Sequence, residues 1–191
     1  VYSDMPGNDT GIKKLADTIR ETEIISNFQM LKEIEAEPDV ESIGASSFPC
    51  LTRMIEGFVP GEVVVVTGAF GSGKTLFCQS LTKDFSDDNE VALWFSYEVG
   101  TRFFLKRFPM NGVTLQFYMP RELVPYSIEF ITGMTKKGCD KVGVNIVFID
   151  HLHYVFDIER SKNVSIDIGK TVRDLKRMAV DLNLVVFLIC H

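Results

Sequence analysis

The sequence has few of the residues that mark specialised classes of protein. Among 191 residues there are four cysteines, three histidines and one tryptophan. So few cysteines in a chain of ordinary globular composition exclude a disulfide scaffold. No two cysteines lie in a C-x-x-C spacing and their surroundings are apolar, so we expect reduced, buried thiols. The apolar run Leu184–Cys190 is far shorter than the roughly 20 residues of a membrane helix. The polar start VYSDMPGNDT does not fit a signal peptide.

These absences predict a protein of the cytoplasm or an organellar matrix, with no membrane partner. Because the chain begins with Val rather than Met and stops at His191, we expect it to be part of a longer protein. Hydrophobic residues make up 46% and charged residues 24%, which is ordinary globular usage and excludes disorder across the whole chain.

The charge is concentrated at one end. Of the 26 acidic and 20 basic residues, ten acidic and four basic residues fall within residues 1–47, which therefore carry the whole net charge of −6. The remainder holds sixteen of each and is neutral. Such a shift predicts two parts, an acidic helical arm and linker at 1–47 and a core at 48–191. Neither part has the basic excess usual in a constitutive nucleic-acid binder.

Apolar residues recur at helical spacing from residue 12 to about residue 35, in one helix or two. Beyond Pro60-Gly61, short β-branched or aromatic runs alternate with helical patterns. The expected strands are 63–66, 91–95, a weaker one at 113–118, 144–149 and 184–190, and the expected helices are 74–85, 99–108, 124–137 and 165–183. The alternation predicts an α/β fold, a mostly parallel twisted sheet with helices on both faces. The run Val63–Val66 favours a strand buried on both faces.

The first strand runs into a glycine-rich stretch that matches the pattern G-x-x-x-x-G-K-[ST] in full. Its residues are Gly68, Ala69, Phe70, Gly71, Ser72, Gly73, Lys74 and Thr75. Glycines let backbone N–H groups surround a polyphosphate, and the following helix start adds further donors. The lysine of this pattern reaches the β- and γ-phosphates, and the hydroxyl binds Mg²⁺. We therefore predict an ATP-binding loop; a glycine-rich turn without a ligand is the alternative.

Two carboxylates follow other strands. Asp150 ends an apolar strand, where it can be the second carboxylate associated with Mg²⁺ or can cap a turn. Glu98 follows the strand 91–95, where a carboxylate can polarise the attacking water as a general base. A solvated Glu at a helix start is the other interpretation.

The three histidines are harder to interpret. His151 and His153 flank Leu152, and strand alternation would place them on one side. Their spacing matches no usual structural zinc pattern, so two polar residues at the edge of a loop are favoured over a metal site. His191 ends the last strand, where it could sense the γ-phosphate or could simply be the terminal residue.

Four segments together resemble the RecA-like core of the DnaB-type replicative helicases, with the nearest resemblance to Twinkle-like and phage primase-helicase-like members. They are SFPCLTRMIEGFVPGEVVVVTGAFGSGKT, LWFSYEV, VFIDHLHYV and IGKTVRDLKRMAVDLNLVVFLICH. The resemblance runs from about Ser46 to His191. It implies a catalytic base at Glu98, Mg²⁺ held by Thr75 and Asp150, and a phosphate sensor at His191.

The resemblance also implies a ring-shaped hexamer with ATP between subunits and single-stranded DNA in the channel. The loop Asp157–Asn163 would be the first of two DNA-binding loops. A helix ahead of the core, residues 12–35 here, packs on the neighbouring subunit in many members; packing on its own core is the alternative. The family's second DNA loop and arginine finger lie beyond residue 191.

The predicted function is thus a DNA helicase core that couples Mg-ATP hydrolysis to translocation on single-stranded DNA during replication. Two alternatives remain at this point. One is a recombinase or clock-type ATPase (RecA-, RadA- or KaiC-like) with the same core, acting in recombination or signalling. The other is a non-catalytic nucleotide-binding module.

Overall fold

The computed structural model describes residues 13, 17–36, 42–108, 115–155 and 163–190. The chain divides into two compact units, Val1–Val40 and Glu41–His191. This division falls earlier than the predicted one at residue 47, because the segment before residue 48 is tied to the second unit. Ile43 and Phe58 exchange backbone hydrogen bonds of 2.8 Å. The Ser47 hydroxyl donates to the Asp84 carboxylate at 2.6 Å.

In the first unit, residues 17–21 are helical and a second helix, α2, spans Asn27–Ala36. Residues 22–26 between them are not helical, so the predicted stretch is broken in two. The Ser26 hydroxyl accepts a hydrogen bond from the Gln29 N–H at 3.2 Å, in the manner of a helix N-cap. No residue of α2 is buried, and the apolar side chains of Phe28, Leu31 and Ile34 are exposed.

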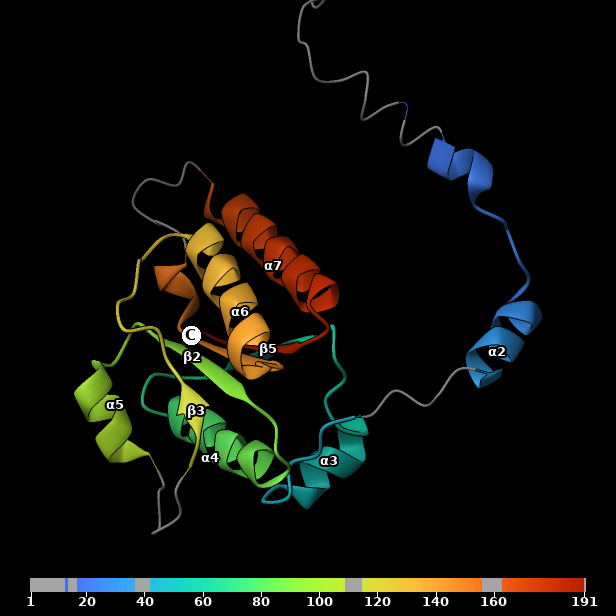
Figure 1. The fold of residues 1–191 in the computed structure, drawn as a ribbon. Helices are drawn as coiled ribbons and strands as arrows, with labels where there is room; N and C mark the ends of the chain where they lie inside the picture. Colours follow the sequence, from blue (N-terminus) through green and yellow to red (C-terminus); the bar gives the residue numbers. More distant parts are fainter. Residues whose placement is uncertain (1–12, 14–16, 37–41, 109–114, 156–162, 191) are drawn as a thin grey trace, which may run out of the picture. The chain divides into compact units, whose positions relative to one another are not determined.

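A five-stranded parallel sheet forms the centre of the second unit (Figure 1). Its strands are β1 (Val63–Thr67), β2 (Ala92–Ser96), β3 (Phe117–Tyr118), β4 (Ile146–Asp150) and β5 (Val185–Cys190). They lie in the order β1-β5-β4-β2-β3, and every pair is parallel. The predicted α/β class is confirmed. The weak third strand is shorter than predicted, and residues 113 and 114 of its predicted range lie outside the described residues.

Helices cover both faces of the sheet. They are α3 (Pro49–Ile55), α4 (Lys74–Asp87), α5 (Thr101–Arg107), α6 (Ile128–Val142) and α7 (Val164–Asp181), with a short 3₁₀ turn, η1, at Leu152–Tyr154. α6 and α7 lie side by side on one face, and α4 lies on the other (Figure 1). This arrangement follows from the alternation of strands and helices, since each connection between parallel strands must cross a face of the sheet.

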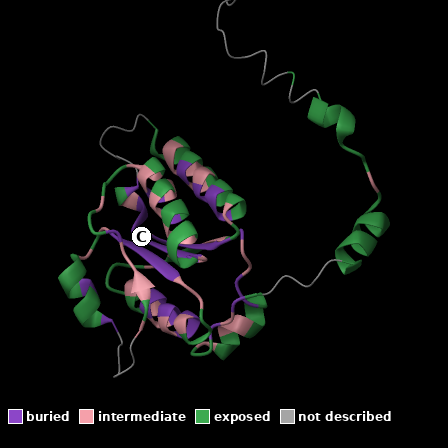
Figure 2. Ribbon diagram, in the orientation of Figure 1, coloured by how far each residue is buried: buried purple, intermediate pink, exposed green. Residues whose placement is uncertain are grey.

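The central strands supply two hydrophobic cores by alternation. On the α4 face, Trp94, Phe148 and Phe187 pack with Phe85 of the helix. On the α6–α7 face, the neighbouring strand residues Phe95, Ile149 and Leu188 pack against α6 and α7. β2, β4 and β5 are accordingly buried almost throughout (Figure 2). The site must therefore lie at the strand ends, where polar side chains reach solvent.

Two expectations about burial were wrong. β1 is not buried on both faces: it pairs only with β5 among the described strands, and Val65 is 51% exposed. A uniform valine run does not distinguish a central strand from an edge strand. Cys50 is exposed, whereas Cys78 is buried and Cys139 and Cys190 are intermediate. Within the described ranges, no helix is long and apolar enough to cross a membrane.

Candidate nucleotide-binding site

The phosphate loop connects β1 to α4 through backbone conformations that favour glycine. Gly71 has φ 73° and Gly73 has φ 88°, both in the left-handed region that a side chain opposes. Gly73 immediately precedes α4, so the unpaired N–H groups of the first helical turn follow the loop directly. The loop and the helix start therefore offer backbone N–H donors of the kind that suit an anion.

The side chain of Lys74 folds back over this loop. Its ammonium donates to the carbonyl oxygens of Gly68 at 2.9 Å and Ala69 at 3.0 Å. These contacts hold the positive charge beside the loop, where a bound polyphosphate would meet it.

Thr75 and Asp150 meet although they are distant in sequence. The Thr75 hydroxyl donates to an Asp150 carboxylate oxygen at 2.8 Å, and Asp150 is fully buried at the end of β4. A hydroxyl and a carboxylate side by side are hard oxygen ligands of the kind that Mg²⁺ prefers. The donor set therefore fits the predicted Mg²⁺.

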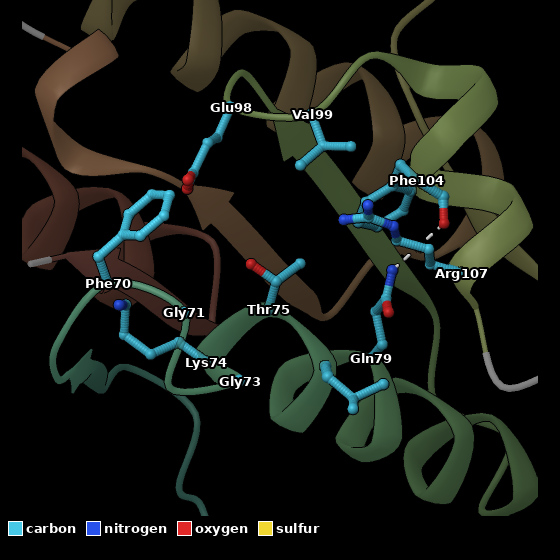
Figure 3. A pocket seen from close by; sticks show the side chains of 11 residues that line it. Phe70, Gly71, Gly73, Lys74, Thr75, Gln79, Glu98, Val99, Phe104 and Arg107 are labelled. Carbon is cyan, nitrogen blue, oxygen red and sulfur yellow. Dashed lines mark hydrogen bonds between the residues drawn. The ribbon is translucent and has the colours of Figure 1, made fainter.

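Glu98 lies just beyond β2, next to the end of β4. Ser96 is in register with Asp150, and the Asp150 carbonyl accepts from the backbone N–H groups of Tyr97 at 2.6 Å and Glu98 at 3.3 Å. The backbone segments that carry Glu98 and Asp150 are thus hydrogen-bonded to each other. Figure 3 shows the Glu98 side chain directed toward the phosphate loop.

A single cavity of about 590 Å³ brings these groups together (Figure 3). Its lining includes Lys74 and Thr75 from the loop side and Glu98 from the opposite side. The structure adds five lining residues that the sequence did not identify: Leu76, Gln79, Val99, Phe104 and Arg107. Phe104 and Arg107 lie one turn apart on α5, so an i, i+3 pattern on the helix after Glu98 was the available signal.

The charge of Asp150 also affects the thiol of Cys78. Burial raises the pKa of the Cys78 thiol far above its usual range, and the negative charge of Asp150 raises it further. A cysteine so close to the site is therefore held in the unreactive thiol form.

His151 and His153 lie close together, on either side of Leu152. The His151 and His153 rings lie 4.5 Å apart, with their Nδ1 atoms at 3.0 Å. Across the described part of the chain, no group of three or more His, Cys, Asp or Glu side chains could hold a metal ion. His191 lies outside the described residues, as does the predicted DNA-binding loop except for Asn163, which caps α7.

A phosphate-loop motif between β1 and α4 of a parallel sheet, with a carboxylate at the end of β4, is the arrangement of the RecA-like P-loop fold. Residues 31–191 match the family model described as AAA domain. The chain therefore belongs to the AAA-domain family.

Many solved structures share this fold, and two of them serve as examples. One is a DnaB-like replicative helicase described with its primase interactions; the identity is 21% and the TM-score 0.68, over 93% of this chain and 51% of that one. The other is described as an ATPase domain, with 19% identity and a TM-score of 0.65, over 97% of this chain and 71% of that one. The chain thus spans about half the length of the first helicase. The predicted RecA-like core, as in DnaB-type helicases, is confirmed.

Proposed function

We propose that this chain is the ATPase core of a DNA helicase, which couples Mg-ATP hydrolysis to translocation on single-stranded DNA during replication. The observation that carries the proposal is the convergence of Lys74, Thr75 and Glu98 around one cavity, with the buried Asp150 hydrogen-bonded to Thr75 behind it. A module that only bound nucleotide would need the loop but not a carboxylate facing it.

Each residue has a definite task in this proposal. The backbone N–H groups of residues 68–73 and the Lys74 ammonium bind the β- and γ-phosphates. Thr75 and Asp150 hold Mg²⁺, which would neutralise charge that develops on the phosphate oxygens. Glu98 accepts a proton from the attacking water, and its position is fixed by the backbone bonds to Asp150. His191 is proposed as the sensor of the γ-phosphate.

The DNA partner and the assembly belong to the same proposal. The likeness to a DnaB-like helicase described with its primase interactions supports a homo-oligomeric ring, expected to be a hexamer, around single-stranded DNA. A neutral core is compatible with such a ring, because a few basic residues from each subunit are concentrated in one channel. A location in the cytoplasm or an organellar matrix fits this role.

Glu98→Gln tests the catalytic assignment. In the assembled full-length protein, loss of the base should lower ATP turnover by about 10²- to 10⁴-fold while nucleotide still binds. The matched control is Glu122→Gln, an exposed carboxylate outside the cavity, which should leave turnover unchanged. Unchanged turnover in Glu98→Gln would show that Glu98 is not the base and would favour a non-catalytic module.

Lys74→Ala tests the nucleotide site itself, and should weaken ATP binding strongly. Intact ATP affinity in this variant would overturn the phosphate-loop assignment. Strand-displacement activity of the full-length protein then separates a helicase from a recombinase or clock-type ATPase, which would hydrolyse ATP without unwinding DNA.

A further inference from the structure

The cavity contains a second cation that the phosphate loop does not supply. Arg107, the last residue of α5, lines the same cavity as Lys74 and Thr75. Figure 3 shows its guanidinium directed into the space between Val99 and Thr75, across the cavity from the Lys74 ammonium. A polyphosphate bound on the loop would therefore have a positive charge on each side.

Arg107 has no carboxylate partner in the described part of the structure. The ion pair found among those residues joins Lys83 and Asp87 at 3.0 Å, on the far end of α4. An arginine on the wall of a polyphosphate cavity, with its charge uncompensated by a side chain there, is suited to bind a phosphate. Its planar fork can donate two parallel hydrogen bonds to phosphate oxygens.

The helix that carries Arg107 is fixed to the phosphate-loop helix. Gln79 of α4 is 2% exposed, and its side-chain amide donates to the Phe104 carbonyl oxygen at 3.4 Å. The Phe104 ring is buried against Trp94, with centroids 4.8 Å apart. Because Phe104 is anchored in this way, Arg107 one turn later is held at the cavity rather than left on a free surface helix.

We propose that Arg107 binds the terminal phosphate of the bound nucleotide and so favours a nucleoside triphosphate over a diphosphate. The assignment rests on the proposed function. Arg107 and Glu98 both come from the segment that follows β2 and form the wall opposite the loop. Glu98 must reach the water next to the γ-phosphate, so that wall faces the terminal phosphate. The inner phosphates remain with the loop and Lys74.

Binding measurements on this chain test the assignment, with fluorescent derivatives of ADP and of a non-hydrolysable ATP analogue as probes. Arg107→Ala should weaken binding of the triphosphate analogue about ten-fold or more, because it removes charge-assisted hydrogen bonds, with much less effect on ADP. Arg107→Lys keeps the positive charge but cannot donate two parallel hydrogen bonds. Its affinity for the triphosphate analogue should therefore lie between those of the parent chain and Arg107→Ala. Arg102→Ala, an exposed arginine of α5 outside the cavity, is the matched control and should bind like the parent chain.

Each outcome is decisive when thermal unfolding shows that the variants are folded. A selective loss for the triphosphate supports the assignment, whereas equal losses for both nucleotides overturn the terminal-phosphate role. No loss for either nucleotide overturns any phosphate contact by Arg107, provided that Lys74→Ala weakens both. If Lys74→Ala also leaves both affinities intact, the nucleotide site of the proposed function has failed instead.

Discussion

Two buried threonines on opposite faces of the sheet differ in their hydrogen bonding. Thr82 of α4 donates to the Cys78 carbonyl at 2.9 Å and accepts from the Trp94 indole N–H at 3.0 Å. Thr135 of α6 is equally buried, but its hydroxyl has no hydrogen-bond partner among the described residues. The same substitution should therefore have different consequences at the two positions.

Thr82→Val should lower the free energy of unfolding by about 1–3 kcal/mol, because it leaves the buried Trp94 N–H without an acceptor. Thr135→Val serves as the matched control and should leave stability unchanged or raise it, since no hydrogen bond is lost and an apolar group is buried. Denaturant unfolding of both variants measures the difference. Equal destabilisation would mean that the Thr135 hydroxyl also has a partner.

At the scale of elements, a tyrosine pair connects the end of β2 with the turn after β4. The Tyr97 and Tyr154 rings are stacked, with centroids 6.1 Å apart and an interplanar angle of 11°. The Tyr97 hydroxyl donates to the Val124 carbonyl at 3.1 Å. Burial raises the pKa of Tyr97 to about 12. Because Tyr97 directly precedes Glu98, this contact also positions the segment that carries the proposed base.

The pKa of Tyr97 predicts a pH dependence at high pH. In the unfolded chain the phenol ionises near about pH 10, whereas in the folded chain it stays protonated to about 12. The unfolded state then binds fewer protons, so this contribution to stability is complete below about pH 10 and is lost as the pH rises toward 12.

Tyr97→Phe should remove this loss, and the difference in free energy of unfolding between parent and variant should shrink from pH 9 toward pH 12. A Tyr97→Phe difference that stays flat over this range would show that the phenol is solvated in the folded state.

Regular elements could be predicted from the sequence where their periodicity was strong, and the exceptions have physical causes. The strands before the phosphate loop and at Asp150 were placed within a residue or two, because apolar runs bounded by glycine or charge leave few choices. β3 was overextended because a weak run of apolar residues does not show where strand pairing stops. The edge position of β1 depends on which strands pair beside it, a tertiary property.

The same distinction holds at the site. The phosphate loop and Asp150 are local signals, since each stands at the end of one apolar strand. Gln79 carries no local signal, and the i, i+3 spacing of Phe104 and Arg107 does not place them at the cavity, because that depends on how α5 packs against α4. The sequence reveals that an arginine is present near Glu98 but not which way its helix faces.

At the scale of the whole molecule, the two units differ in how they are stabilised. The described helices of the first unit bury almost nothing: no residue of the ten-residue α2 is buried. A helix of this length is marginal in water without packing. The second unit, by contrast, has two continuous hydrophobic cores. Local opening should therefore cost far less free energy in the first unit.

Limited trypsin digestion should reflect this difference. The first cuts should fall at Arg20 and Lys32, both exposed in the first unit, while Lys136 of α6, also exposed, should survive because α6 packs on the core. Mass spectrometry of early time points identifies the cuts, and the resistant product should keep the parent's midpoint of thermal unfolding. Early cleavage at Lys136 would contradict the division into a weakly and a strongly stabilised unit.

The rarity of tryptophan in this chain gives the core one more property. Trp94, the only tryptophan, is fully buried and stacks on Phe148 with ring centroids 4.4 Å apart. It also contacts Phe104 of α5, whose side chain lines the candidate nucleotide cavity. Its intrinsic fluorescence therefore has a single origin at the junction of β2, β4 and α5. Trp94 fluorescence therefore reports on this junction without an added label, and a nucleotide that shifts α5 should change the emission of Trp94.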